Sequence, residues 1–579
     1  MGWSETPRVV NRRQLLAAVS ILGVGTVGFQ RSLAQSVAEK GEVTLEMIRD
    51  AEWIAGLELS DEEREATLKN LRRNLDQLRQ LRQTPIDHGV APALQFDPQP
   101  FVKSSSEPIA RTAVARETAA GTLPATDEEI AFLPVTELAA LLRTRKLTSQ
   151  RLTRIYLDRL QKYDPLINCV VTLTEATAMQ QAARADWEMD SGRYRGSLHG
   201  IPWGAKDLMS YPGYPTTWGA TETKQQQFDF KATVAERLDQ AGAVLVAKLS
   251  LGALAMGDKW FGKRTNNPWD PERGSSGSSA GSASAVAAGM VGFAIGTETL
   301  GSIVSPCRRC GCAGLRPTFG RVSRYGCMTL SWSMDKVGPI ARGLEDCALV
   351  LDAIHGADQL DATVKSLPFT WPCQTNVRTL RVGYFEDDPD SVAAADVLKR
   401  IGAQLVPIQL PDALPVWAVA SMLDVEAATV FDEWTRKKIT QDLNEWPDIF
   451  RAAEFVSAVD YLRAARIRSQ LMVQMSELFD GIDCFVGNQG LPHTNLTGHP
   501  AVVVPHGYEV RKGRTVPTSI TFTGNLYQED ALLQVADCYQ RELNLGVRYP
   551  ELDRFLADQK TQQEDSATPA AEGSVQEAD

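Results

Sequence analysis

The chain has 579 residues, of which 43% are hydrophobic, 7% aromatic and 23% charged. This composition is typical of a globular protein, and the length predicts either several domains or one large enzyme core with additions. The formal net charge of -12 at pH 7 argues against nucleic acid or an anionic membrane surface as the main partner.

The N-terminus has the layout of an export signal. Arg12 and Arg13 precede a run of apolar and small residues over 15–29, and Ser32 and Ala34 offer small residues where a signal peptidase cleaves. The paired arginines favour the twin-arginine route. A membrane anchor is the alternative, but fifteen residues rise only about 22 Å as a helix, short of the roughly 30 Å hydrocarbon core. We expect residues 1–34 to be a twin-arginine signal peptide of a bacterial periplasmic or secreted protein, with membrane contact only through an uncleaved signal.

Apolar residues spaced by three and four predict two helices between Val43 and Arg82. The second begins after Ser60, and Glu63 three residues later completes a capping box. We interpret 35–82 as a helical extension docked on the main body. Residues 83–127 are rich in Pro, Ser, Thr and Ala and show no periodicity, which predicts an extended linker.

From 128 to 557, amphipathic helices alternate with short apolar strands. Residues 136–142 and 148–163 have the helical pattern, whereas 243–248 and 379–384 are apolar runs typical of buried strands. This alternation predicts an α/β fold with a largely buried mixed or parallel sheet. Residues 558–579 contain almost no large apolar side chain, so we expect a disordered acidic tail.

The nine cysteines are scattered and odd in number, which does not suggest a disulfide framework. Cys307, Cys310 and Cys312 lie close together, but no second group of Cys or His follows at zinc-site spacing. Neither a phosphate loop nor a dinucleotide fingerprint is present. We therefore expect no metal and no cofactor.

Residues 273–284 form a glycine- and serine-rich run of the kind that linkers also show. Here, however, a small-residue helical pattern over 283–290 follows at once, then an apolar strand and a second glycine-flanked serine, Ser302. Glycine and serine between core elements indicate that the backbone closely approaches itself or a ligand. The G-x-S-x-G elbow of another hydrolase class is absent around Ser302.

A serine nucleophile needs a base. None of the six histidines lies in the serine-rich run, although His199, His499 and His506 each stand beside a Gly or Pro turn and remain candidates. A lysine whose pKa is lowered by burial is the other option. Lys206 is that candidate because it lies in an apolar, small-residue stretch, although a single such lysine is more often a surface residue.

Several long segments, in the right order, resemble the amidase signature family over about residues 128–555. The resemblance implies that family's fold, a central mixed β-sheet covered by helices. The segments that carry it are 199–207, 215–217, 267–289, 296–306, 314–323, 335–342, 495–501 and 504–507.

The resemblance implies a Ser–cis-Ser–Lys triad with Ser302 as nucleophile, Ser278 as proton relay and Lys206 as base. Ser278 lies 24 positions before Ser302 (302 minus 278), which is the family's spacing, and the Gly277–Ser278 peptide is expected to be cis. The resemblance also implies supporting hydrogen bonds from Thr297 and Ser279. The backbone groups expected to form the oxyanion hole are the N–H groups of Thr299, Leu300, Gly301 and Ser302.

The sequence departs from the family at several of these positions. Leu300 stands where glycine is usual, and Ser276 and Ala280 also replace common glycines. Val304 stands where an arginine usually pairs with the acid at Glu298, so Glu298 needs another partner.

The implied activity is hydrolysis of the C–N bond of a linear, small-molecule carboxylic amide through a serine acyl-enzyme. One alternative is the glutaminase-type A subunit of a tRNA-dependent amidotransferase, against which the export signal and the helical extension argue. Another is a catalytically inactive amidase-fold binding protein, for which Leu300 and Val304 are the arguments. The pocket-forming region, about 366–479, matches no known specificity, and a homodimer is compatible with the sequence.

Overall fold

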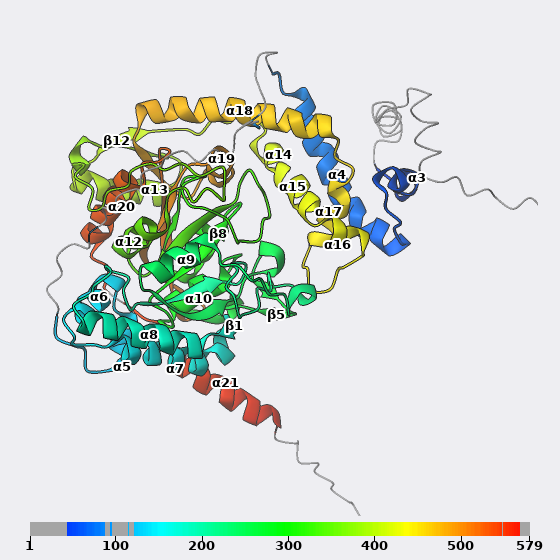
Figure 1. Ribbon diagram of the computed structural model, residues 1–579. Helices are drawn as coiled ribbons and strands as arrows, with labels where there is room; N and C mark the ends of the chain where they lie inside the picture. Colours follow the sequence, from blue (N-terminus) through cyan, green and yellow to red (C-terminus); the bar gives the residue numbers. More distant parts are fainter. Residues whose placement is uncertain (1–42, 87–92, 95–113, 115–120, 547, 568–579) are drawn as a thin grey trace, which may run out of the picture.

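The computed structural model describes residues 43–86, 93–94, 114, 121–546 and 548–567 (Figure 1). The expected signal peptide, most of the expected linker and the end of the expected tail lie outside these residues. In the part of the chain that is described, no helix is long and apolar enough to cross a membrane.

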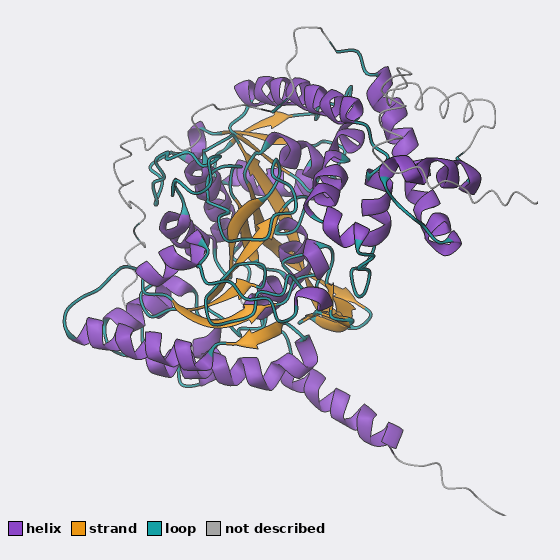
Figure 2. Cartoon of the chain, turned by 45° about the vertical axis from the view of Figure 1, so that its right-hand side comes forward, coloured by secondary structure: helices purple, strands orange, loops and turns teal. Residues whose placement is uncertain are grey.

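A mixed, eleven-stranded sheet runs through the molecule and confirms the predicted fold class (Figure 2). β2 pairs in parallel with β3 and β8, β11 does so with β13 and β12, and the other neighbours are antiparallel. In spatial order the strands are β1 (Val170–Leu173), β3 (Val244–Leu249), β2 (Pro202–Lys206), β8 (Phe293–Glu298), β10 (Lys336–Ala341), β9 (Ala313–Arg316), β14 (Ala501–Arg511), β15 (Arg514–Gly524), β13 (Cys484–Val486), β11 (Arg381–Tyr384) and β12 (Gln404–Pro407).

The sheet separates two hydrophobic cores. Successive side chains of a strand point to opposite faces. In β14, Val502 and Val504 belong to one core and Val503 to the other, and in β8 Phe293 and Ala294 divide in the same way. Both faces are therefore covered, which explains why every residue of β2, β3, β9 and β10 is buried.

Helices cover both faces of the sheet (Figure 2). The first core is covered by α5 (Asp127–Phe132), α6 (Val135–Arg143), α9 (Thr233–Gln240), α12 (Leu344–Ile354), α13 (Pro389–Arg400) and α20 (Glu529–Leu543). The second core is covered by α8 (Glu175–Asp190), α10 (Ala280–Ala287) and α11 (Val304–Cys310), and α7 (Ser149–Ile167) contributes to both. Short elements complete this body: α19 (Leu491–Thr497), η1 (Thr221–Thr223), η2 (Ala253–Ala255), η3 (Val377–Thr379), and the hairpins β4 (Lys259–Trp260) with β5 (Lys263–Arg264) and β6 (Asn266–Asn267) with β7 (Asp270–Gly274).

The N-terminal helical pair is confirmed as α3 (Leu45–Ala55) and α4 (Asp61–Gln83). The predicted capping box is present, with Glu63 N donating to Ser60 Oγ at 3.1 Å and Ser60 N donating to Glu63 Oε2 at 2.8 Å. α4 packs beside a peripheral group of helices, where Leu81 is buried and Arg82 donates to both carboxylate oxygens of Asp460 (Figure 1). That group consists of α14 (Val416–Ala420), α15 (Met422–Val430), α16 (Asp432–Arg436), α17 (Trp446–Ala453) and α18 (Ala458–Gly481).

The expectation of disorder from residue 558 needs correction, because α21 (Leu552–Ala567) continues beyond that point. The prediction used only the lack of large apolar side chains. Residues 558–567 are mostly Asp, Gln, Lys, Glu and Ala, and several of these are good helix formers. A helix that begins on buried Leu552 can therefore propagate into a polar segment.

Candidate active site

Lys206 is the last residue of β2, in the middle of the sheet. Every residue of this strand is buried, and Lys206 itself is 0% exposed. The neighbouring Asp207 does not pair with it, because its carboxylate binds Lys248 Nζ at 2.7 Å and accepts from Thr217 N. Lys206 is thus an amine within the core and without an ion-pair partner among the described residues.

The Lys206 amine is held by neutral oxygens. Its Nζ donates to Ser278 Oγ at 2.8 Å, Ser279 Oγ at 3.1 Å and Thr297 Oγ1 at 2.8 Å. The Thr297 carbonyl lies 3.3 Å away. Hydroxyls can accept from an ammonium or donate to a neutral amine, so this arrangement tolerates both protonation states.

Burial lowers the pKa of Lys206 from its ordinary value of 10.5 to about 7, and the more distant charges of Asp335 and Glu298 offset only part of this effect. A charged group loses its hydration when it is buried, so the neutral form is favoured. Near neutral pH a large fraction of Lys206 is unprotonated and can accept a proton.

Ser278 directly precedes Ser279, the N-cap of α10. The Gly277–Ser278 peptide is cis, as expected. A Cβ at Gly277 would lie 1.8 Å from the carbonyl oxygen of Gly257, so no side chain fits at that position. The glycine- and serine-rich run is therefore packed core, and Ser278 is 1% exposed.

Ser302 lies in the turn between β8 and α11 and is 8% exposed. Ser279 N donates to its carbonyl at 3.1 Å, which fixes this turn against the segment that carries Ser278. Its hydroxyl makes no hydrogen bond with the described residues, and the contact from Ser278 Oγ to Ser302 Oγ is not formed in this state. The structure thus brings Lys206, Ser278, Ser279 and Thr297 into one hydrogen-bonded group and places Ser302 beside it.

The backbone of the same turn offers free donors. In the described structure the N–H groups of Thr299, Leu300, Gly301 and Ser302 have no acceptor. Gly301 has a φ of 92°, a conformation that favours glycine, and the turn is tight enough that a Cβ there would meet Leu491 at 3.1 Å. Unpaired N–H groups next to a serine can stabilise a developing oxyanion. Leu300 contributes its backbone to this turn and packs its side chain against the hydrophobic cluster of α14 and α18.

Glu298 finds a partner that the sequence analysis missed. Arg316 Nη1 donates to its Oε1 at 2.7 Å, and Asn495 Nδ2 donates to the same oxygen at 2.9 Å. The other oxygen accepts from Ile303 N at 2.8 Å and Val304 N at 2.9 Å, directly after Ser302. Arg316 thus pairs with Glu298, the role that the family resemblance gives to an arginine at 304. An arginine in the fully buried strand β9 was the sequence feature that could have indicated a buried partner.

Burial by itself raises the pKa of Glu298, but the charges of Arg316 and Lys336 and the hydrogen bonds bring it down to about 2. The buried carboxylate is therefore ionised and holds the N-terminal turn of α11. It fixes the backbone immediately after Ser302 through two charge-assisted bonds.

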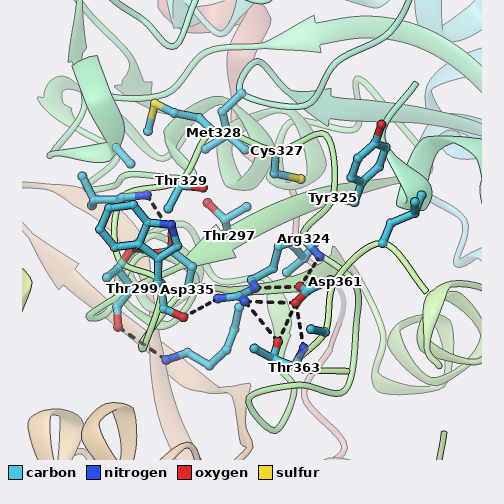
Figure 3. A pocket seen from close by; sticks show the side chains of 18 residues that line it. Thr297, Thr299, Arg324, Tyr325, Cys327, Met328, Thr329, Asp335, Asp361 and Thr363 are labelled. Carbon is cyan, nitrogen blue, oxygen red and sulfur yellow. Dashed lines mark hydrogen bonds and ion pairs between the residues drawn. The ribbon is translucent and has the colours of Figure 1, made fainter. Parts of the chain in front are cut away.

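A cavity of about 240 Å³ borders this group, with Thr297 and Thr299 in its wall (Figure 3). Thr299 Oγ1 donates to Asp335 Oδ1 at 2.6 Å, and Lys336 Nζ lies 3.4 Å from the Thr299 carbonyl. On the opposite side Arg324 binds Asp361, so its charge is already compensated (Figure 3). The apolar part of the wall includes Leu208, Ala255, Met328, Leu330, Trp332 and Val337.

The three histidines that sequence left open have other partners. His199 lies 3.2 Å from Glu188, His499 bonds Thr497 and stacks on Phe479, and His506 bonds Tyr539. None of the three bonds Ser302, so the lysine is the base that the geometry offers. Cys307, Cys310 and Cys312 are buried free thiols in the same hydrophobic cluster as Ile303 and Val304.

A family model described as Amidase matches residues 151–487. Curated relatives include the A subunit of the glutamyl-tRNA(Gln) amidotransferase of Chloroflexus aurantiacus, 33% identical over 491 residues, with 73% of this chain and 99% of the relative covered. The protein of the same name from Coxiella burnetii is 32% identical over 485 residues, with 72% and 99% covered.

Similar solved structures include the native peptide amidase from Stenotrophomonas maltophilia, with 28% identity, a TM-score of 0.65 and coverage of 72% of this chain and 98% of that one. An amidase family protein from Bacillus anthracis has a TM-score of 0.65, 24% identity and coverage of 73% and 93%, a likeness of fold.

The reactivity of Ser302 should follow the protonation of Lys206. We expect the rate of covalent labelling by a fluorophosphonate, measured by intact mass, to rise with pH through an apparent pKa of about 7 and then level off, because only the neutral amine accepts a proton. Lys206→Ala should label far more slowly and lose this step. A rate that keeps rising up to pH 10 would show that the amine has an ordinary pKa.

Removing the partner of Glu298 should destabilise the protein. Arg316→Met leaves a buried, unpaired carboxylate, so we expect the free energy of unfolding to fall by about 3–5 kcal/mol at pH 7.5. The deficit should shrink as pH falls toward 4.5, because burial alone raises the pKa of Glu298 and the variant can protonate it.

The double variant Arg316→Met with Glu298→Gln is the matched control and should recover part of the loss in denaturant unfolding. A single variant within about 1 kcal/mol of the wild type would show that the pair does not support the turn.

Proposed function

The chain belongs to the amidase signature family, and we propose that it hydrolyses the C–N bond of a linear carboxylic amide through an acyl-enzyme on Ser302. The observation that carries this proposal is a buried lysine with a pKa near 7, hydrogen-bonded to Ser278 beside the turn of Ser302. A neutral lysine and a relay serine supply the base that a serine nucleophile needs.

In the proposed mechanism, Ser302 Oγ attacks the amide carbonyl carbon while its proton passes to Ser278 Oγ, and the Ser278 proton passes to Lys206 Nζ. The C–N bond then breaks as the relay returns a proton to the leaving nitrogen. Water attacks the ester by the same route and releases the acid. Attack requires Ser302 Oγ to come within hydrogen-bond distance of Ser278 Oγ, which a rotation of the Ser302 side chain on substrate binding provides.

The free N–H groups of the turn support the second half of the proposal. In the proposed mechanism they stabilise the negative charge that develops on the carbonyl oxygen, and backbone donors do not need to reorganise during the reaction. Glu298 and Asp335 hold this turn from either end, by accepting from Ile303 N and from Thr299 Oγ1. The mostly apolar cavity beside Thr297 and Thr299 would take the acyl group.

Amine or ammonia release from a panel of primary and secondary amides tests the activity. We expect Ser302→Ala to lower kcat/KM by at least about 10³-fold, and Lys206→Ala and Ser278→Ala by about 10²–10⁴-fold. Ser191→Ala, at the exposed end of α8, is a control that should keep full activity. A folded wild type that cleaves no amide and takes no label on Ser302 would instead support an inactive binding protein.

The similarity to the A subunits of amidotransferases favours a second candidate, a glutaminase that acts within a larger assembly. Release of ammonia from glutamine only when a second protein co-purifies with the full-length chain would support it. Hydrolysis by the chain alone would favour the independent amidase.

We further propose that residues 1–34 direct export through the twin-arginine route, since Arg12 and Arg13 precede the apolar run. In a bacterium with this route, the exported protein should begin at Gln35 by N-terminal sequencing. Replacing Arg12 and Arg13 by lysine should retain the chain in the cytoplasm, whereas Arg8→Lys should not. Unchanged export of the double variant would contradict the route.

A further inference from the structure

A second cavity, of about 600 Å³, borders the segments that carry Ser278 and Ser302. Ser276, two residues before the relay serine, and Ser305, three residues after the nucleophile, are both in its wall. The cavity beside Thr297 and Thr299 shares neither residue. The two cavities thus have different walls, and both border the chain segments next to Ser278 and Ser302.

Unpaired positive charge distinguishes this second cavity. Arg273, Arg308 and Arg309 line it, and in the described structure the guanidinium of each makes neither an ion pair nor a hydrogen bond. Arg308 is half-buried, and burial lowers its pKa while Asp390 and Asp388 raise it. An anion that binds a half-buried, unpaired guanidinium compensates its partly desolvated charge, so such a guanidinium favours anion binding.

The acidic side chains of the wall do not cancel this charge. Asp270 is paired with Arg514, and Glu509 with Arg511 at 2.5 Å. Asp390 lines the cavity but lies beyond ion-pair distance of Arg308. Positive charge therefore remains in excess in the wall, and a planar guanidinium can bind a carboxylate with two parallel bonds.

The position of Arg308 limits where the carboxylate sits in the substrate. Ser305 and Arg308 are three residues apart on α11 and therefore share a face, about 4.5 Å apart along the axis. Arg308 therefore lines the same cavity as Ser305, which lies three residues after Ser302. The leaving nitrogen must lie next to Ser278, which returns its proton, and Ser276 on that side lines the charged cavity.

We propose that the amine half of the substrate carries a carboxylate that binds Arg308, so that the substrate class is an N-acyl amino acid or N-acyl β-amino acid. This inference rests on the proposed amidase function. Hydrolysis adds one water: the acyl carbon gains the oxygen, the C–N bond breaks, and the nitrogen leaves as the ammonium of a free amino acid. The acyl chain occupies the apolar cavity beside Thr299.

Two isosteric substrates test the inference on the full-length chain. N-butanoyl-β-alanine carries the carboxylate on the amine, and N-butanoyl-3-methylbutylamine has an isopropyl group in its place. Amine release should give a kcat/KM at least ten-fold higher for the charged substrate. In Arg308→Gln this ratio should fall to about one, mainly through KM, and Arg308→Lys should keep an intermediate ratio.

Arg400→Gln is the charge-matched control, since it removes one exposed arginine of α13 outside the cavity, and its ratio should stay within two-fold of the wild type. N-(3-methylbutyl)succinamate, which carries its carboxylate on the acyl side, should not be preferred. A wild-type ratio near one, a preference for the succinamate, or an unchanged ratio in Arg308→Gln would overturn the inference.

Binding separates this inference from the proposed function. N-butanoyl-β-alanine should bind Ser302→Ala in calorimetry at least ten-fold more tightly than it binds the Ser302→Ala, Arg308→Gln double variant, whether or not the wild type turns over. If the wild type does not turn over but this difference in affinity is present, the proposed amidase function is contradicted and the anion site is supported. Equal binding to the two variants would overturn the site.

Discussion

The site depends on one constraint, the burial of the Lys206 amine among neutral oxygens. The nearest acid in sequence, Asp207, is committed to Lys248 and Thr217, so it cannot hold Lys206 in its charged form by direct pairing. The three hydroxyls around Nζ satisfy its hydrogen bonds without adding a negative charge. Because dehydration of an ammonium is costly and nothing adjacent compensates for it, the pKa falls into the range where a lysine can act as a base. A carboxylate at any of those three positions would keep the amine protonated.

A second requirement is that the nucleophile turn stays rigid while its N–H groups stay free. Glu298 and Asp335 meet this requirement from the two ends of the turn. Glu298 accepts from Ile303 N and Asp335 from the Thr299 hydroxyl, so neither carboxylate occupies the backbone N–H groups of residues 299–302. Two buried carboxylates are costly unless they are compensated. Arg316 pairs with Glu298, and backbone N–H groups of Leu330 and Ser331 bond Asp335. The polar core behind the turn thus positions the backbone and leaves the reacting side free for substrate.

The two sides of that turn differ in chemistry. Towards Thr297 and Thr299 the wall is mostly apolar, and the charge of Arg324 is compensated within the wall by Asp361. Towards Ser276 and Ser305 the wall carries guanidinium groups without partners among the described residues. An asymmetric environment of this kind orients a substrate, because an apolar chain binds favourably only against the apolar wall and an anionic group only against the guanidinium groups. Orientation matters for the proposed mechanism, since only one end of the amide can receive the returning proton.

The sequence by itself determined the mixed α/β class, the helical pair before the main body, the packed role of the serine-rich run and Lys206 as a candidate base, and its family resemblance implied Ser278 and Ser302. These follow from local patterns: apolar spacing, small residues between core elements, and motifs that keep their order. Only the tertiary structure decided that Arg316 pairs with Glu298, that His199, His499 and His506 have other partners, and that Arg308 faces a cavity. Those facts join residues from distant strands and helices, and pairing across the sheet leaves no local pattern. The disorder assigned from residue 558 was wrong as far as Ala567, because helix propensity and the anchor at Leu552 outweigh the lack of apolar side chains.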